Sequence, residues 1–315
     1  MSLCRLLACQ VIFLSFLSVL PGCNQDDAST DENIPDTVFE QDTVTTDYTS
    51  AAFTSGIEGP VVDGDGNLYV VNINEQGTIG VVDTSGIGTL FVTLPSGSIG
   101  NGLRFSKDYK TLFVADYVNH QVLQVEMATR DISVFAAADD RLNQPNDIAI
   151  SSKGVIYASD PNWGNSTGNL WIVSTNGEFE LVEDSMGTTN GVEVSPNDEK
   201  LYVNESVQRR IWVYDIDEDG NPVNKQLFHE FTDFGLDGMR CDEEGNLYVA
   251  RFGKGTVAVI NPDGELKFEV KLSGKNPTNV AFGGADGRTC YVTIQDRKLV
   301  ERFRNAIPGR SFMIE

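Results

Sequence analysis

The chain has 315 residues, a formal net charge of −23 at pH 7, a hydrophobic fraction of 40% and 30 glycines. This composition excludes a disordered chain, because enough apolar side chains are present to bury a sizeable core, and the glycine content is typical of a turn-rich globular fold. The negative charge argues against a nucleic-acid-binding surface, since phosphates would be repelled, but it is compatible with a bound divalent cation.

Residues 1–23 form a separate N-terminal element. They contain one positive charge, Arg5, then an apolar run, and they end in Leu20-Pro21-Gly22-Cys23. This pattern predicts a secretory signal peptide, and the apolar run is short for a membrane span. The ending resembles a bacterial lipobox, which implies that Cys23 is lipidated after cleavage; an ordinary signal peptide or a membrane anchor is the alternative. We therefore expect an exported protein, periplasmic or on the cell surface, that contacts a membrane through its lipid anchor only.

Residues 24–47 are predicted to be an acidic linker that precedes a single domain at 48–315. Eight acidic side chains and no Lys or Arg fall between residues 24 and 50, which is typical of a solvated spacer. The domain has two cysteines, Cys241 and Cys290, and each falls inside an apolar strand pattern. We expect both to be buried thiols, not a disulfide.

One pattern recurs six times along the domain. Each copy begins with a residue that carries a side-chain oxygen and continues with an apolar strand, a turn and a second apolar strand. The leading residues are Glu58, Asn101, Asn146, Asn190, Asp237 and Thr278, at intervals of 41 to 47 residues. A period of this length with several short strands per repeat predicts an all-β fold, a six-bladed β-propeller.

The fifth repeat shows four strands, so we expect four-stranded blades. Apolar strand patterns cover residues 239–241, 246–250, 255–260 and 265–272, and turns at 242–246 and 261–264 separate them. The sixth repeat ends near 298–304 and lacks an outer strand. Residues around 50–54 lie upstream of the first repeat, and we expect this N-terminal segment to supply the strand and close the ring.

The leading residues are expected to meet at one mouth of the central channel, because the first strand of every blade lines the axis. Asn-Gly and Asp-Gly are also common turn dipeptides, so strand-entry chemistry explains any one of these residues equally well. The set favours a site, since two carboxylates at a narrow mouth repel each other unless a cation is present. The all-oxygen donors suit Ca²⁺, and they are Glu58, Asn146, Asn190 and Asp237.

Short motifs in these repeats identify a family. They are Glu58-Gly59-Pro60, Pro145-Asn146-Asp147, Ser159-Asp160-Pro161, Asn190-Gly191, Asp237-Gly238-Met239 and the run 277–284. With them the chain resembles, over about 57–295, the senescence marker protein (regucalcin)/gluconolactonase/luciferin-regenerating enzyme family, especially its bacterial gluconolactonase-like members. The resemblance implies that the four donors hold a catalytic metal, usually Ca²⁺, with Zn²⁺, Mn²⁺ or Mg²⁺ as alternatives. It also implies hydrolysis of a small-molecule lactone, often a sugar lactone, with Asp237 as general base.

Three further residues are expected to contact the substrate. Asn101 leads the second repeat, where paraoxonases carry a catalytic histidine, and Gln144 stands where regucalcin has an arginine that grips a polyhydroxy substrate. Trp163, in the loop 161–164, is expected to overhang the mouth and stack on a sugar face. The alternative for Trp163 is a place in the core between two blades.

Two other functions remain open at this point. One is a phosphotriesterase or arylesterase-type hydrolase that uses the same metal. The other is a propeller without catalytic activity that binds a glycan or a protein around a structural metal. No feature of the sequence identifies a protein partner.

Overall fold

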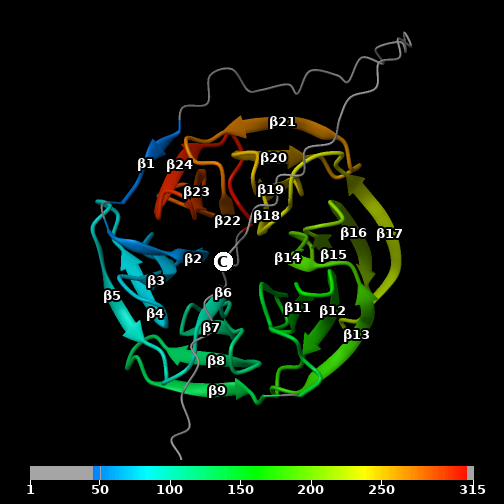
Figure 1. Ribbon diagram of the computed structural model, residues 1–315, viewed down its shortest axis with the longest axis horizontal. Coiled ribbons are helices and arrows are strands. Elements are labelled where there is room, and N and C mark those ends of the chain that lie inside the picture. The colour runs from blue at the N-terminus through cyan, green and yellow to red at the C-terminus, as the bar shows by residue number, and fades with distance from the viewer. Residues whose placement is uncertain (1–44, 50, 139, 311–315) are drawn as a thin grey trace, which may run out of the picture. The chain divides into compact units, whose positions relative to one another are not determined.

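The computed structural model describes residues 45–49, 51–138 and 140–310, and all regular structure in these ranges is β-sheet. Its strands form six antiparallel sheets of four strands arranged in a ring (Figure 1). The predicted six-bladed β-propeller is therefore confirmed. No helix in the described ranges has the length and apolarity that crossing a membrane requires. The predicted signal peptide, the lipidation site Cys23 and the predicted linker up to residue 44 lie outside the described residues.

The first three blades follow one another along the chain. Blade 1 contains β2 (Phe53–Val62), β3 (Leu68–Ile73), β4 (Thr78–Val82) and β5 (Gly88–Thr93). Blade 2 contains β6 (Gly100–Phe105), β7 (Thr111–Asp116), β8 (Gln121–Glu126) and β9 (Ile132–Ala136). Blade 3 contains β10 (Ile148–Ile150), β11 (Ile156–Asn162), β12 (Thr167–Val173) and β13 (Phe179–Met186).

The remaining three blades complete the ring. Blade 4 contains β14 (Thr189–Val194), β15 (Lys200–Glu205), β16 (Arg210–Ile216) and β17 (Pro222–Glu230). Blade 5 contains β18 (Met239–Cys241), β19 (Leu247–Arg251), β20 (Thr256–Ile260) and β21 (Leu266–Lys271). Blade 6 contains β22 (Pro277–Gly283), β23 (Thr289–Ile294), β24 (Leu299–Arg304) and the N-terminal β1 (Thr46–Asp47). The four strands predicted for the fifth repeat thus match blade 5 to within one residue at each end.

Burial follows the position of a strand within its blade. Every residue of β19 and β20 is buried, because middle strands have a neighbouring blade on each face, and their sequences are almost continuously apolar. The outer strand β17 places polar side chains such as Asn224 and Gln226 in solvent. This gradient explains why the inner half of each repeat gave the clearest apolar pattern in the sequence.

The hydrophobic core lies between the blades. The described residues form six buried apolar clusters, one at each interface between neighbouring blades. At the interface of blades 1 and 2, for example, the rings of Tyr69 and Phe105 meet edge to face with centroids 5.3 Å apart. Cys241 and Cys290 are buried free thiols in two of these clusters, as predicted.

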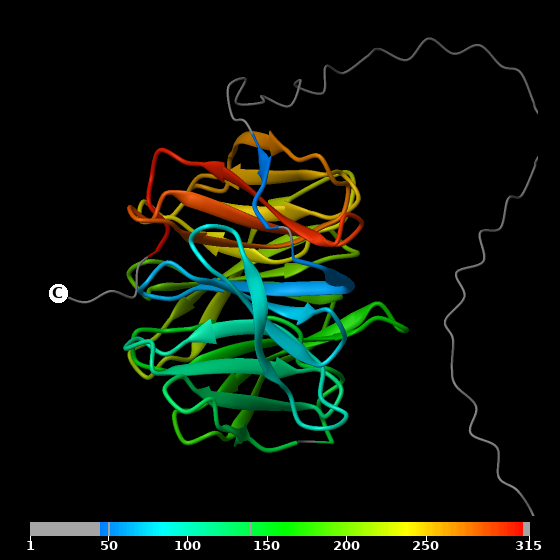
Figure 2. The same ribbon diagram turned by 90° about the vertical axis from the view of Figure 1, so that its left-hand side faces the viewer.

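The N-terminal strand closes the ring, as predicted, but it lies earlier in the chain than residues 50–54. Thr46 and Asp47 of β1 pair with β24 of blade 6 (Figure 2). The Arg297 guanidinium binds the Asp47 carboxylate at 2.6 Å. The prediction of 50–54 was wrong because the inner strand of blade 1 is long and already begins at Phe53. The closing strand therefore includes residues 46 and 47, which had been predicted to belong to the linker.

Candidate functional site

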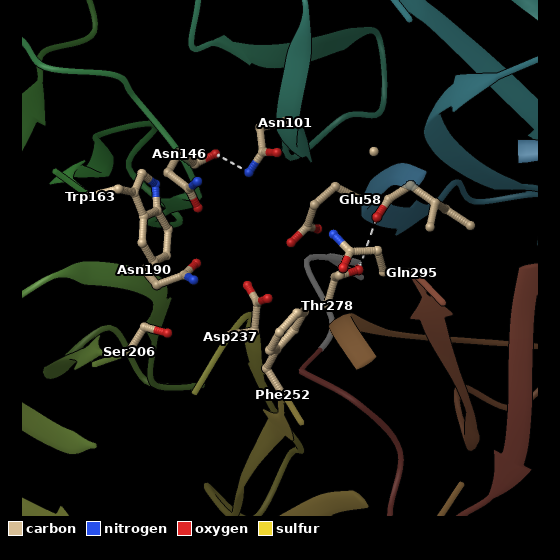
Figure 3. Close-up of a pocket in the computed structure, with 12 residues that line it drawn as sticks. Glu58, Asn101, Asn146, Trp163, Asn190, Ser206, Asp237, Phe252, Thr278 and Gln295 are labelled. Carbon is tan, nitrogen blue, oxygen red and sulfur yellow. Dashed lines mark hydrogen bonds between the residues drawn. The ribbon is translucent and has the colours of Figure 1, made fainter. Parts of the chain in front are cut away.

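The six leading residues lie at equivalent places around the ring. Asn101, Asn190 and Thr278 are each the second residue of an inner strand, Asn146 and Asp237 come two residues before β10 and β18, and Glu58 lies within β2. All six line one cavity of about 260 Å³ at a mouth of the central channel (Figure 3). This volume is below the roughly 300–1,000 Å³ of pockets for drug-sized ligands, so the cavity suits one small ring.

Irregular strand pairing helps to direct these side chains into the channel. The pairing of the inner strand with its neighbour shifts register at or beside Glu58, Asn101, Asn190 and Thr278. A bulge leaves one residue unpaired, bends the strand and re-aims the side chain. The site is therefore built by departures from regular pairing, which a strand pattern in the sequence does not show.

The glycine that follows a leading residue has a packing role of its own. A Cβ added to Gly238 would lie 1.9 Å from Cγ of Asn279 in the next blade, and one on Gly191 would lie 2.4 Å from the carbonyl oxygen of Asp237. The Gly238 N–H donates to the Thr278 carbonyl oxygen at 2.7 Å. The Asp-Gly dipeptide therefore brings two inner strands together. Close packing accounts for the glycine, but it does not account for the carboxylate before it.

Two carboxyl groups face each other across the cavity, one from Glu58 and one from Asp237 (Figure 3). Removal from water raises the pKa of both, and Asp147 raises that of Glu58 further, while the negative charge of Glu58 raises that of Asp237. The Gly59 N–H, which donates to Glu58, offsets part of the cost on that side. The arrangement is electrostatically unfavourable by itself, and a positive charge between the two groups would relieve it.

Two amide oxygens of the same cavity have no hydrogen-bond partner. They are Oδ1 of Asn146 and Oδ1 of Asn190, and both are buried. A buried acceptor without a partner costs about 1–3 kcal/mol, and an absent ion is one of its recognised causes. Among residues 45–310 as described, no group of three or more His, Cys, Asp or Glu side chains could hold a metal. A metal here would therefore depend on these amide oxygens together with the two carboxylates.

The other two leading residues bind their neighbours. Nδ2 of Asn101 donates to the carbonyl oxygen of Asn146 at 3.1 Å, and Oγ1 of Thr278 donates to the carbonyl oxygen of Ile57 at 3.0 Å (Figure 3). Each contact fixes the backbone at or next to a candidate metal ligand. Asn101 lines the cavity, as expected for a residue in contact with substrate, but its amide group also steadies Asn146.

Guanidinium groups sit among carboxylates beside the candidate ligands. Arg104 and Arg240 are both buried, and each pairs with Asp147 and with Glu193 at 3.3–3.9 Å. Arg240 also donates to the carbonyl oxygen of Pro60 at 3.2 Å. Burial, and then the charge of Arg104, lower the pKa of Arg240 to about 10. These four groups tie blades 1, 2, 3, 4 and 5 together at the axis.

The structure supports one of the other two residues that were predicted to contact the substrate, Trp163 and Gln144, and not the other. Trp163 lines the cavity from the loop between β11 and β12 and is 44% exposed, which excludes the alternative of a core position. Gln144 is absent from the cavity lining, and its backbone N–H donates to the Asp160 carboxylate at 2.6 Å. The expectation that Gln144 contacts substrate at this cavity therefore has no support in the geometry.

Five lining residues were missed by the sequence reasoning: Gly56 and Ile57, which precede Glu58 in β2, and Ser206, Phe252 and Gln295. Each of the last three directly follows the second strand of its blade, β15, β19 or β23. In an antiparallel blade the second strand returns to the mouth where the first strand began, so its last residues reach the same cavity. The signal was available: all three occupy the same place in the repeat, four residues after a tyrosine at 202, 248 or 291.

Comparison with protein families gives a match over residues 56–296 to the SMP-30/Gluconolactonase/LRE-like region. The chain belongs to this family. The predicted family membership is thereby confirmed, and the six-bladed ring agrees with it. The family match includes every leading residue of the six repeats.

Individual relatives agree with this assignment. A gluconolactonase from Zymomonas mobilis is 30% identical over 216 residues, which is 61% of this chain and 60% of that protein. A diisopropyl-fluorophosphatase from Loligo vulgaris is 27% identical over 278 residues, covering 79% of this chain and 88% of the squid protein. A solved structure from Agrobacterium tumefaciens, described as the calcium-binding protein regucalcin, has a TM-score of 0.71 at 22% identity. The alignment covers 83% of this chain and 92% of the chain in that structure, and at 22% identity the similarity supports the fold.

Proposed function

We propose that this protein is a divalent-metal-dependent hydrolase that opens lactones, with Ca²⁺ as the metal and sugar lactones as the first substrate class to test. One observation carries the proposal: two carboxylates and two unpartnered amide oxygens converge on a single small cavity. The gluconolactonase relative supports the lactone part, and the structural neighbour described as calcium-binding supports the metal part.

The donor set fits Ca²⁺ better than a transition metal. Glu58 and Asp237 supply two negative charges, and Asn146 and Asn190 supply neutral oxygens, which are the ligands that Ca²⁺ accepts in irregular geometry. Neither His120 nor His229 lines the cavity, and no cysteine of the described residues does, so the ligands that Zn²⁺ favours are missing from its described wall. Bound there, the cation would polarise a lactone carbonyl and offset the negative charge that develops on its oxygen.

Asp237 is the residue suited to move the proton. It lies in the segment just before β18, whereas Glu58 is held within β2 and bonded by the Gly59 N–H. The Asp237 carboxylate takes a proton from a water molecule while the water oxygen bonds to the carbonyl carbon. The ring C–O bond then breaks, and the same proton passes to the leaving alkoxide, so the product is a hydroxy acid.

Other residues of the cavity orient the substrate. Ser206 and Gln295 present a hydroxyl and an amide at opposite sides of the mouth, where they can bond the ring hydroxyls of a sugar lactone (Figure 3). Trp163 offers a partly exposed aromatic face beside them. None of these side chains is charged, so they would bind and orient a neutral substrate without competing for the metal.

A phosphotriesterase activity is the second candidate. The specific observation in its favour is the diisopropyl-fluorophosphatase relative, whose alignment covers more of both chains than that of the gluconolactonase. The same two carboxylates and two amides would serve either chemistry. A fluorophosphate substrate therefore belongs beside the lactones in any assay. A propeller that only binds a glycan or protein is the remaining alternative.

The test is hydrolysis of a lactone panel followed in a pH-stat. Wild-type protein is measured with Ca²⁺ and with EDTA, beside Asp237→Asn with Ca²⁺. We expect EDTA to abolish the rate and Asp237→Asn to lower it by about 10²–10⁴-fold, the range for loss of a general base. Glu180→Gln, on the exposed face of β13, is the matched control and should keep the wild-type rate. Equal rates in all arms, or none in any, would reject metal-assisted lactone hydrolysis.

We also propose that the protein acts outside the cytoplasm as a lipoprotein anchored through Cys23. The support is the N-terminal sequence alone, with its single Arg5, apolar run and Leu-Pro-Gly-Cys ending. Mass spectrometry of the N-terminal peptide of membrane-bound protein should find a lipid-modified Cys23. The Cys23→Ser variant should leave the detergent phase. An unmodified peptide from protein that starts elsewhere would contradict the anchor.

A further inference from the structure

Large apolar side chains gather on one side of the cavity mouth. Trp163 and Phe252 line the cavity from blades 3 and 5, with Asn190 and Ser206 between them (Figure 3). Phe234 extends this side, because a Cβ added to Gly253, the neighbour of Phe252, would lie 3.3 Å from its ring. Trp163 is 44% and Phe234 49% exposed. Exposed aromatic rings beside a cavity are a marker of ligand contact. We call Trp163, Phe234 and Phe252 the aromatic wall.

Phe234 is held in a backbone conformation that a bulky residue rarely adopts. Its φ is +46°, and at a non-glycine residue this left-handed geometry costs of order 1–3 kcal/mol. An exposed phenylalanine gains little from packing in return. Strain of this kind persists where the surroundings impose it, and it concentrates at ligand sites. The backbone of Phe234 is thus a second observation, independent of exposure, that points to a ligand.

A buried guanidinium holds the residue that precedes Phe234. Nη2 of Arg251 donates to the carbonyl oxygen and to Oδ1 of Asp233, both at 2.7 Å, and Arg251 itself is fully buried. Its Nη1 binds Glu269 at 3.0 Å, and its guanidinium lies 3.5 Å from the ring centre of Phe231. The residue before Phe234 is therefore fixed to the core of blade 5, so the ring is presented at the mouth by a rigid support.

The charge of the cavity narrows the ligand further. Within the described part of the chain, no Lys, Arg or His lines the cavity, and its ionisable lining groups are Glu58 and Asp237. With these two carboxylates paired to the proposed Ca²⁺, no lining side chain remains to pair the charge of a phosphorylated or sulfonated lactone. The polar lining residues Thr278 and Gln295 lie across the cavity from Trp163, while the ring of Phe252 lies beside Thr278 (Figure 3). Polar and apolar side chains therefore both border the mouth.

We propose that the aromatic wall is a subsite for an alkyl or aryl substituent on the lactone ring. The substrate class is then an uncharged lactone that carries an apolar group, with its carbonyl toward the two carboxylates and its substituent against Trp163, Phe234 and Phe252. This inference rests on the proposed lactone hydrolysis, and it names a lactone with an apolar substituent, in place of a sugar lactone, as the preferred substrate. Each methylene group that becomes fully buried in an apolar site raises kcat/KM by roughly 10-fold or more. At a partly exposed wall the gain in kcat/KM per methylene is smaller.

The experiment compares kcat/KM for four lactones: δ-valerolactone, δ-decalactone, glucono-δ-lactone and a phosphorylated gluconolactone. Wild-type protein with Ca²⁺ should prefer δ-decalactone to δ-valerolactone by about 10-fold or more and should open the phosphorylated lactone slowest. The decisive variant is Phe234→Gly. Glycine adopts a positive φ without steric cost, so this variant should melt at or above the wild-type temperature while its δ-decalactone to δ-valerolactone ratio falls at least 3-fold.

The control and the opposing outcomes separate this inference from the proposed function. Leu227→Ala removes an equally exposed apolar side chain from the outer strand β17, 50% exposed, and should leave the ratio unchanged. The subsite is refuted if glucono-δ-lactone is the preferred substrate, or if Phe234→Gly and Trp163→Ala both keep the wild-type ratio. Hydrolysis of none of the four lactones would instead overturn the proposed function itself, and the subsite with it.

Discussion

Replacing Glu58 by glutamine should stabilise the metal-free protein and destabilise the metal-bound one. The Glu58 carboxylate is 7% exposed, and burial together with the charge of Asp147 raises its pKa from 4.5 to about 7. The folded state therefore disfavours the ionised carboxylate. At pH 8, above both pKa values, the group is ionised in the folded and the unfolded protein, so the full free-energy cost of burying its charge is present. A rise of this size corresponds to about 3 kcal/mol at about 1.4 kcal/mol per pKa unit. Glutamine keeps the shape and an acceptor for the Gly59 N–H, but it removes the charge.

Thermal unfolding at pH 8 in EDTA and in Ca²⁺ measures both effects. About 3 kcal/mol corresponds to a rise of roughly 6–10 °C in Tm for the variant in EDTA. In Ca²⁺ at about 100 times Kd the wild type gains about 2.7 kcal/mol, and the variant should gain much less, so the difference in EDTA shrinks or reverses. Glu180→Gln should match the wild type under both conditions. A variant that melts below the wild type in EDTA, or that gains as much from Ca²⁺, would refute the reasoning.

Two further predictions concern the frame around the site. In a urea titration, Gly238→Ala should lower the free energy of unfolding by about 3 kcal/mol, because the new Cβ would lie 1.9 Å from Cγ of Asn279. The control Gly64→Ala should be nearly neutral, because no atom lies closer than 3.7 Å to its new Cβ. Arg240→Met should lower the free energy of unfolding, measured by calorimetry, by about 3–5 kcal/mol, because Asp147 and Glu193 lose one buried cation. Arg210→Met breaks the exposed pair with Glu230 and should lower it by less than about 1 kcal/mol. Equal losses for either matched pair would contradict the packing or the ion network described here.

The sequence was sufficient for the ring because the repeat is encoded in apolar strands. The middle strands of blade 5 are almost continuously apolar, and their spacing recurs in every blade, so strand positions could be predicted to within one residue there. The closing strand could not be located, since β1 is two residues long and its sequence, Thr46–Asp47, is as polar as the linker. Its place is set by pairing with β24, which no local pattern shows.

The sequence predicted those residues of the candidate site that occupy equivalent positions in the repeats. The four donors were predicted because equivalent positions of a propeller converge, and the structure brings them to one cavity. Ser206, Phe252 and Gln295 follow from the same symmetry applied to the second strand, but their side chains share no chemistry that would have marked them. Phe234 lies outside the repeat pattern altogether. Its position depends on the ion pair between buried Arg251 and exposed Asp233, a contact that the sequence does not display.

The most direct test of the central claim is a crystal structure determined in millimolar Ca²⁺. The account predicts one cation peak in contact with oxygens of Glu58, Asn146, Asn190 and Asp237 at about 2.3–2.6 Å, with both amide groups turned so that Oδ1 faces the ion. A cavity that stays without a cation while the amide nitrogens of Asn146 and Asn190 donate to the two carboxylates would contradict it.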